Sequence, residues 1–260
     1  MKRSPTTFKV GTRPSNLAVA QARAALDQIE HQLEPHRFEI HPLSTVGDRD
    51  RTTDLRQSPA DFFTHELDTA LLNGTIDCAL HSAKDLPEPL DPEIDWFWLP
   101  HREEPRDALI LRPNQTLADL PPNPIFGISS DRRATYTTEH FPDAIQQPIR
   151  GNIEDRLEQL DQGTFDVIIM AAAALNRLEL QHRIHHFISL DHLPVPEGQG
   201  YLAITFRKGD TRFQTLRALY TPAVTIAGAG VGHRDLRTIA TLRARQRCDP
   251  CPHHPPPPQR

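Results

Sequence analysis

The chain has 260 residues, enough for one large domain or two ordinary domains that each bury a core, and we expect two. Its 34 acidic and 29 basic residues give a formal net charge of −5, which argues against a general nucleic-acid binder, because such proteins present a broad basic face. No apolar run approaches the roughly 20 residues that span a bilayer, and three cysteines make no disulfide framework, so we expect a cytoplasmic protein with no membrane partner.

Short apolar runs alternate with segments of helical periodicity, which predicts an α/β protein with largely parallel sheets. Residues 8–10 are typical of a first strand, and residues 17–33 of a helix that follows a turn at residues 11–15. A strand that leads into a helix N-terminus forms a site for anions. We therefore expect Arg13, in this turn, to face a ligand.

A second helix and strand are predicted over residues 63–71 and 76–80, and they end in the segment His81-Ser82-Ala83-Lys84-Asp85. In open α/β sheets, ligands collect at the carboxyl ends of the strands. We therefore expect this segment to lie at the same sheet edge as Arg13.

A second unit begins near Arg102, with strands predicted at residues 108–111, 125–128 and 167–170. Asn152 is positioned to cap a helix that starts at Ile153. The strand at residues 203–206 then returns the chain to the first unit, and two crossings of this kind make a hinge. The predicted boundaries are residues 1–100 with 194–222 for lobe 1, 101–193 for lobe 2, and 223–260 for a separate tail.

Basic side chains cluster in the loops of both units. Arg132 and Arg133 stand at a predicted helix start, Arg150 and Arg156 flank another, and Lys84 adjoins Asp85. Arginine forks bind carboxylates in a bidentate way, and a Lys-Asp pair beside them can handle a proton or a developing charge. The pattern predicts a pocket for a molecule that carries several carboxylates.

Each of these features also has a plainer interpretation. The arginines could belong to solvated helix starts, and Lys84-Asp85 could be an exposed pair worth about 0 to 1 kcal/mol. Ser15 and Asp48 are either helix caps or ligand groups. His81 follows a buried strand, which favours a structural hydrogen-bonding residue over a catalytic base.

A series of motifs in this order resembles the hydroxymethylbilane synthase family, also called porphobilinogen deaminase, over about residues 8–207. The motifs include Gly11-Thr12-Arg13, Val46-Gly47-Asp48, His81-Ser82-Ala83-Lys84-Asp85-Leu86-Pro87, Arg106-Asp107-Ala108, Ser129-Ser130 with Arg132-Arg133, Arg150-Gly151-Asn152 and Gly198-Gln199-Gly200. The resemblance implies two lobes like those of a type II periplasmic binding protein, joined by a double-crossing hinge, with the active site between them.

The family condenses four porphobilinogen molecules head to tail in tetrapyrrole (heme) biosynthesis, releases ammonia each time, and grows the chain on a covalently held dipyrromethane cofactor. The resemblance implies that Asp85 is the catalytic carboxylate and stabilises the cationic azafulvene left when ammonia departs. It implies that the cofactor is bound by Lys84, Asp85, Ser129, Arg132 and Arg133. It also implies that porphobilinogen and the growing polypyrrole are bound by Arg13, Ser15, Arg150, Arg156 and Arg177.

The sequence departs from the family in a loop that is usually rich in glycine and lysine, where this chain has residues 56–63. Arg56 is a candidate to replace one lost cationic contact. Ala60 and Asp61 remove another and add repulsion toward a carboxylated ligand.

The larger departure follows Arg207. The family's third domain presents the cysteine that anchors dipyrromethane, and we find no resemblance to that domain in residues 208–260, so we expect the domain and the usual attachment cysteine to be missing. Cys78 is predicted to be a buried small hydrophobe. Cys248 and Cys251 lie in a proline-rich tail with no second pair of metal ligands, and we expect no metal.

Residues 224–232 resemble instead the opening strand and glycine turn of uroporphyrinogen-III C-methyltransferase, an enzyme of the same pathway. We interpret this as the start of a fused gene that was cut or frameshifted near Arg247, followed by a disordered tail. A later enzyme of the pathway, fused or separate, is therefore a candidate partner. The sequence as a whole predicts a hydroxymethylbilane synthase, with a noncatalytic binder of polycarboxylated pyrroles or other small anions as the alternative.

Overall fold

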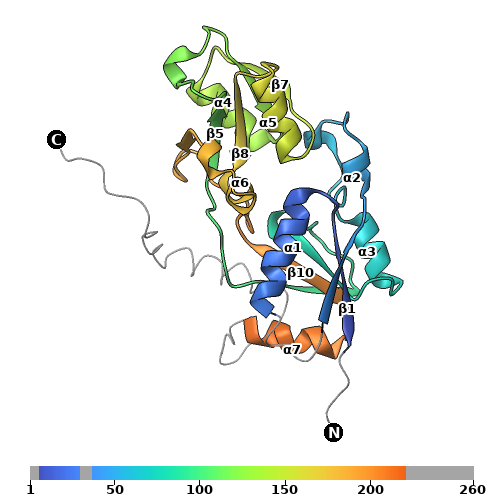
Figure 1. Cartoon of the computed structure of the whole chain (residues 1–260). Helices are drawn as coiled ribbons and strands as arrows, with labels where there is room; N and C mark the ends of the chain where they lie inside the picture. The colour runs from blue at the N-terminus through green and yellow to red at the C-terminus, as the bar shows by residue number, and fades with distance from the viewer. Residues whose placement is uncertain (1–5, 30–36, 221–260) are drawn as a thin grey trace, which may run out of the picture. The chain divides into compact units, whose positions relative to one another are not determined.

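Two five-stranded sheets form the framework of the chain (Figure 1). The computed structural model describes residues 6–29 and 37–220. Sheet A has the strand order β2-β1-β3-β10-β4, and sheet B the order β7-β6-β8-β5-β9. The strands are β1 (Thr7–Thr12), β2 (Arg37–Pro42), β3 (Cys78–Ser82), β4 (Ile94–Trp98), β5 (Asp107–Leu111), β6 (Ile125–Ile128), β7 (Ile145–Pro148), β8 (Val167–Ala171), β9 (His186–Phe187) and β10 (Leu202–Arg207).

Helices follow most of the strands. They are α1 (Asn16–Ile29), α2 (Val46–Arg49), α3 (His65–Leu72), α4 (Asp131–His140), α5 (Ile153–Asp161), α6 (Ala172–Arg177) and α7 (Thr211–Tyr220), with short 3-10 turns η2 (Leu55–Gln57), η3 (Ala83–Asp85), η4 (Leu117–Asp119) and η5 (Gln181–Arg183). The expected α/β class is confirmed. We call sheet A with its helices lobe 1 and sheet B with its helices lobe 2.

Both sheets are mixed, but the expectation of largely parallel sheets holds for four of the five strands in each, and one strand, β10 in sheet A and β5 in sheet B, runs against the others. In sheet A, β1 is parallel to β2 and β3, whereas β10 runs antiparallel to β3 and β4. In sheet B, β6 is parallel to β7 and β8, whereas β5 runs antiparallel to β8 and β9. The physical reason lies in the crossings: β5 and β10 each arrive from the other sheet, enter at the carboxyl end of a neighbouring strand and therefore run in the opposite direction.

The chain passes from sheet A to sheet B between β4 and β5, and returns between β9 and β10. The exact lobe boundaries at residues 100, 101, 193 and 194 remain a prediction. The tail at residues 223–260, including the segment 224–232 and the cysteines Cys248 and Cys251, lies outside the described residues.

Alternating side chains along β3 pack against helices on opposite faces of sheet A, as the two-residue period of a strand requires. Cys78 and Leu80 share a core with residues of α1 and α7, while Ala79 packs with residues of α3. Cys78 is 1% exposed, which confirms that it is a buried small hydrophobe. The strand begins at Cys78, two residues later than expected.

Sheet B is built in the same way around β8, whose five residues are all buried. Ile168 and Met170 pack with residues of α5 and α6, and Val167 and Ile169 pack with Tyr136 of α4. Among the described residues, none of the helices has the length and apolar character needed to cross a membrane.

Two glycines fix the return of the chain into sheet A. Gly198 and Gly200 adopt φ angles of +79° and +92°, a region that other L residues rarely occupy. A Cβ atom on Gly200 would lie 2.4 Å from the carbonyl oxygen of Glu103, and one on Gly198 would lie 2.9 Å from the backbone of Lys84. Gln199 between them is thereby held close to Lys84.

His81 is a buried structural residue, as expected. Its Nε2 atom lies 3.0 Å from the hydroxyl of Thr205 on the neighbouring strand β10. Burial, with a smaller effect from the charge of Arg13, lowers the pKa of His81 from 6.5 to about 4. The folded protein therefore keeps His81 neutral at pH values where the unfolded chain takes up a proton.

This difference predicts an acid-dependent loss of stability. Because the folded pKa is depressed, the stabilisation is present above pH 6.5 and is lost as the pH falls toward 4, by up to about 3 kcal/mol. His81→Gln keeps a hydrogen-bonding group beside Thr205 but cannot titrate. Urea unfolding at pH 7 and pH 4.5 should show a smaller loss of unfolding free energy in the variant than in the wild type; equal losses would contradict the assignment.

Candidate functional site

A cavity of about 730 Å³ is lined by loops that follow strands of both sheets. Eight basic side chains line it, against two acidic ones, Asp48 and Asp85. The basic residues are Arg13, Arg51, Lys84, Arg132, Arg133, Arg150, Arg156 and Arg177. Such an excess of positive charge in one cavity is an electrostatic match for a ligand with several negative groups.

The loop between β1 and α1 supplies Arg13 and Ser15. The Nε atom of Arg13 donates to Asp48 at 3.0 Å, and its guanidinium lies 4.1 Å from the centre of the Phe63 ring. Burial raises the pKa of Asp48, but the hydrogen bond and charge of Arg13 outweigh that effect and lower it below its usual value. Ser15 accepts from the backbone N–H of Ala18 at 3.2 Å, so it caps the start of α1.

The turn after β3 supplies Lys84 and Asp85. Lys84 Nζ donates to Gln199 Oε1 at 3.2 Å. Burial lowers the pKa of Lys84, the charge of Asp85 opposes this, and the charge of Arg133 adds to it. Within the described residues, the carboxylate of Asp85 makes no hydrogen bond and no ion pair, although it lines the cavity. Its oxygens are available to a ligand.

The N-terminus of α4 supplies two arginines that share one buried carboxylate. Arg132 Nη2 donates to Asp107 Oδ2 at 2.5 Å, and Arg133 Nη2 donates to Asp107 Oδ1 at 2.9 Å. Arg133 Nη1 donates to Ser129 Oγ at 3.1 Å. Burial raises the pKa of Asp107, but the charges of Arg133 and Arg132 hold it well below its usual range. Asp107 is therefore ionised and allows the two cations to lie side by side.

The N-terminus of α5 supplies Arg150 and Arg156. Arg150 Nη2 donates to the carbonyl oxygens of Gly47 and Asp50 in lobe 1. Arg156 Nε donates to the carbonyl oxygen of Gly151 at 2.9 Å, and burial together with the charge of Arg133 lowers the pKa of Arg156 to about 10. Asn152 caps α5 through the N–H of Asp155 at 2.9 Å, as the sequence predicts.

Arg177 and a group of apolar residues also line the cavity. Arg177 Nη2 donates to the carbonyl oxygen of Gly200 at 2.6 Å, and burial lowers its pKa. The apolar part of the lining comes from Leu17, Leu55, Phe63, Ile153, Met170, Ala171, Ala173 and Ala174. Flat apolar rings with acidic substituents would therefore find both kinds of contact.

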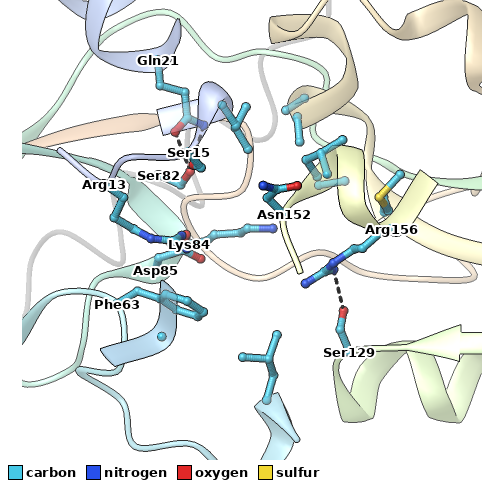
Figure 2. A pocket seen from close by; sticks show the side chains of 18 of the residues that line it. Arg13, Ser15, Gln21, Phe63, Ser82, Lys84, Asp85, Ser129, Asn152 and Arg156 are labelled. Atoms are coloured by element: carbon cyan, nitrogen blue, oxygen red, sulfur yellow. Dashed lines mark hydrogen bonds between the residues drawn. The ribbon is translucent and has the colours of Figure 1, made fainter. Parts of the chain in front are cut away.

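Figure 2 shows the two sides of this cavity. Arg13, Phe63 and Asp85 lie on one side, and Ser129 and Arg156, joined by a hydrogen bond of 3.4 Å, lie on the other. The Lys84 side chain extends between them toward Asn152 (Figure 2). Groups from both lobes thus face one space.

Every residue that the sequence nominated for the site lines this cavity: Arg13, Ser15, Lys84, Asp85, Ser129, Arg132, Arg133, Arg150, Arg156 and Arg177. The interpretation of the basic residues as solvated surface groups is wrong, because none of them is exposed. Their individual roles toward substrate and cofactor remain predictions. For Ser15 and Asp48, the helix-capping interpretation is correct, and both also line the cavity.

The expectation that Arg56 replaces a cationic contact finds no support. Arg56 does not line the cavity; its guanidinium pairs with Asp54 through contacts of 2.5 and 3.0 Å. Asp61 likewise lies outside the lining and is 3.2 Å from His65.

Asp107 and Gln199 are residues of the site for which the sequence predicts no role. Gln199 Nε2 donates to Asp107 Oδ1 at 3.0 Å and to the carbonyl oxygen of Pro105 at 2.7 Å, so its amide oxygen is left to face Lys84. The signal that could have found Asp107 is a charged residue at the start of β5, directly before the apolar run at residues 108–111. Such a residue needs a buried partner if the strand is in the core.

The donor set fits a cofactor that carries carboxylates. Arg132 Nη1 and Arg150 Nε are buried donors without a hydrogen-bond partner in the described residues, so each can take an acceptor from a ligand. A covalent anchor is a separate matter. The cysteine in the described part of the chain, Cys78, is in the core of lobe 1, and burial raises the pKa of its thiol, so it offers no thiolate to the cavity.

Comparison with known proteins identifies relatives over most of the chain. The family described as "Porphobilinogen deaminase, dipyromethane cofactor binding domain" matches residues 8–215. The porphobilinogen deaminase of Deinococcus radiodurans is 41% identical over 78% of this chain and 67% of its own length. That of Paenibacillus macerans is 36% identical over 85% of this chain and 71% of its own length.

A third porphobilinogen deaminase, from Syntrophotalea carbinolica, is 36% identical over 91% of this chain and 75% of its own length. Among solved structures, the BenM effector binding domain with benzoate aligns with 84% of this chain and 93% of that chain, at 14% identity and a TM-score of 0.47. The family match over residues 8–215 and these sequence identities establish that the chain belongs to the porphobilinogen deaminase family.

Proposed function

We propose that this chain is a hydroxymethylbilane synthase that condenses four porphobilinogen molecules head to tail and releases ammonia at each step. The observation that carries the proposal is the cavity itself. Eight basic side chains line it together with two carboxylates: Asp48, which Arg13 holds, and Asp85, which has no hydrogen bond or ion pair within the described residues. Each porphobilinogen carries an acetate and a propionate, so a growing chain requires this kind of cationic enclosure.

The charge of the cavity supports binding of many carboxylates at once. Arg156 stays protonated at neutral pH, because its pKa of about 10 is lowered but still well above 7. Burial disfavours its charged form, and the charge of Arg133 adds to this effect. A carboxylate placed between the two would offset that repulsion, so ligand binding and the charge state of the cavity support each other.

Two groups of residues divide the binding work in our proposal. Lys84, Ser129, Arg132 and Arg133 would hold the carboxylates of dipyrromethane, which supplies the primer on which the pyrrole chain grows. Arg13, Ser15, Arg150, Arg156 and Arg177 would contact porphobilinogen and the growing polypyrrole. The division follows the family resemblance. What supports a ligand contact in each group is that Arg132 and Arg150 each keep one buried donor without a partner in the described residues, while protein oxygens hold their other ends.

Asp85 is the proposed catalytic carboxylate. Loss of ammonia leaves positive charge on the pyrrole, and a carboxylate that is already in place stabilises that charge without reorganisation. Asp85 can also accept hydrogen bonds from the pyrrole N–H groups, because within the described residues no protein donor is bonded to its oxygens. The adjacent Lys84 is held by Gln199, not by Asp85, which leaves the carboxylate for the substrate.

A noncatalytic binder of polycarboxylated pyrroles is the second candidate. The observation that favours it is the position of Cys78, which is buried in the core and does not line the cavity. The enzyme, by contrast, would hold dipyrromethane without a covalent link, or through the thiol of another chain. We further propose cytoplasmic activity, with a later enzyme of the pathway as a partner.

Incubation with porphobilinogen separates the two candidates. We expect the enzyme to release ammonia and the intact-protein mass to rise in discrete steps of one pyrrole unit if the chain is bound covalently. Ammonia release with an unchanged mass would indicate catalysis on a noncovalently held primer. Binding of porphobilinogen without ammonia release would contradict the enzyme assignment and support the binder.

Asp85→Asn tests the catalytic assignment, because it keeps the shape of the side chain and removes its charge. We expect ammonia release to fall at least about a hundredfold, as for the loss of a preorganised electrostatic group. The matched control is Asp143→Asn, the same change at an exposed carboxylate outside the cavity, which should stay within about twofold of wild type. Undiminished release from a folded Asp85→Asn protein would refute the role of Asp85.

A further inference from the structure

Residues 46–63 of lobe 1 contain three arginines, which differ in their partners and in their access to the cavity. Arg49 pairs with Glu66 at 2.5 Å and donates to the carbonyl oxygen of Ser44 at 2.7 Å. Arg56 makes a forked contact with Asp54, only two residues away. Arg51 lines the cavity, and the other two do not.

The partner of Arg51 lies in the other lobe. Arg51 Nη1 is 3.2 Å from Asp155 Oδ2, in the first turn of α5. The Arg51 side chain is 65% exposed and that of Asp155 31% exposed. An ion pair this accessible to solvent is weak, because water and salt screen the attraction, and it can exchange partners at little cost.

Asp155 does not depend on Arg51. The same Oδ2 atom accepts from the backbone N–H of Asn152 at 3.1 Å and so completes the capping box of α5. A carboxylate at a helix N-terminus is also stabilised by the helix dipole. If Arg51 moved to another anion, Asp155 would keep both of these interactions.

We propose that Arg51 captures a carboxylate of the incoming substrate by exchanging Asp155 for it. This inference rests on the proposed function. It gives Arg51 the role of replacement cationic contact that the sequence predicts for Arg56. Arg51 combines three properties: it lines the cavity, its guanidinium is largely accessible, and its present partner is replaceable. Arg13, by contrast, is held by Asp48 and by the ring of Phe63.

A neighbouring contact allows Arg51 to exchange its partner without movement of the lobes. Arg150 is anchored to the carbonyl oxygens of Gly47 and Asp50, on the same segment as Arg51. The segment is therefore held to lobe 2 by a contact that does not involve Arg51, and exchange at Arg51 does not require the lobes to separate. Asp155 acts as a competitor for Arg51, not as a ligand contact.

Capture and a purely structural latch predict opposite results for the two partners. If Arg51 and Asp155 only hold the lobes together, Arg51→Gln and Asp155→Asn should both weaken substrate binding. If Arg51 captures substrate, Arg51→Gln should weaken binding, whereas Asp155→Asn should strengthen it by freeing the guanidinium. The Asn side chain retains an oxygen that can accept from Asn152, so the cap of α5 is preserved.

The experiment measures KM and kcat for ammonia release, and the Kd for porphobilinogen, at two salt concentrations. We expect Arg51→Gln to raise KM and Kd about five- to tenfold, with kcat changed less than about twofold and a weaker dependence on salt. Asp155→Asn should lower KM and Kd about twofold. The matched control Arg56→Gln makes the same charge change in the same segment and should leave both constants within about twofold.

Equal effects of Arg51→Gln and Arg56→Gln, or weaker binding in Asp155→Asn with an unchanged melting temperature, would overturn the inference while leaving the proposed function in place. If wild-type protein binds porphobilinogen without releasing ammonia, the proposed function fails, and the ranking of Kd values still decides the role of Arg51. Protein that neither binds nor reacts would refute both.

Discussion

A single buried carboxylate, Asp107, holds together the cationic side of the cavity. It accepts from Arg132, Arg133 and Gln199 and is 0% exposed. Removing one partner of a buried ion pair leaves an uncompensated charge and typically costs about 3 to 5 kcal/mol. Asp107 is the first residue of β5, where the chain enters lobe 2. The chain passes the same place at Gln199 on its return to lobe 1, so Asp107 can contact Gln199 as well as the two arginines.

The remaining charges follow from the same constraint. Cations can be crowded into a cavity only if protein acceptors hold part of each group and leave another part for the ligand. Arg132 is fixed by Asp107 yet keeps one unpaired donor, and Arg150 is fixed by two carbonyl oxygens yet keeps another. Burial, with a smaller effect from the charge of Arg133, lowers the pKa values of Lys84 and Arg156. Carboxylates bound beside these two groups would favour their charged forms.

Much of this could be predicted from the sequence, since the strands and helix starts have strong local signals. Asn152 before Ile153 predicts a cap, and the run 125–128 predicts a buried strand; both agree with the structure. The reversed direction of β5 and β10 could not be predicted, because it depends on where these strands enter their sheets. The ion-pair partners of the arginines could not be predicted either. Asp54 lies close in sequence to both Arg51 and Arg56, so the sequence does not show which of the two it holds. That Arg51 lines the cavity depends on packing against Asp155, a distant segment.

The central claim is that basic groups from both lobes converge on one cavity that binds acidic pyrroles. The most direct measurement is a crystal structure of the chain after incubation with porphobilinogen. We predict pyrrole density in the cavity, with ligand carboxylates within hydrogen-bonding distance of Lys84 from lobe 1 and of Arg132 from lobe 2. Ligand bound elsewhere, or a structure in which these side chains do not share a cavity, would contradict the account.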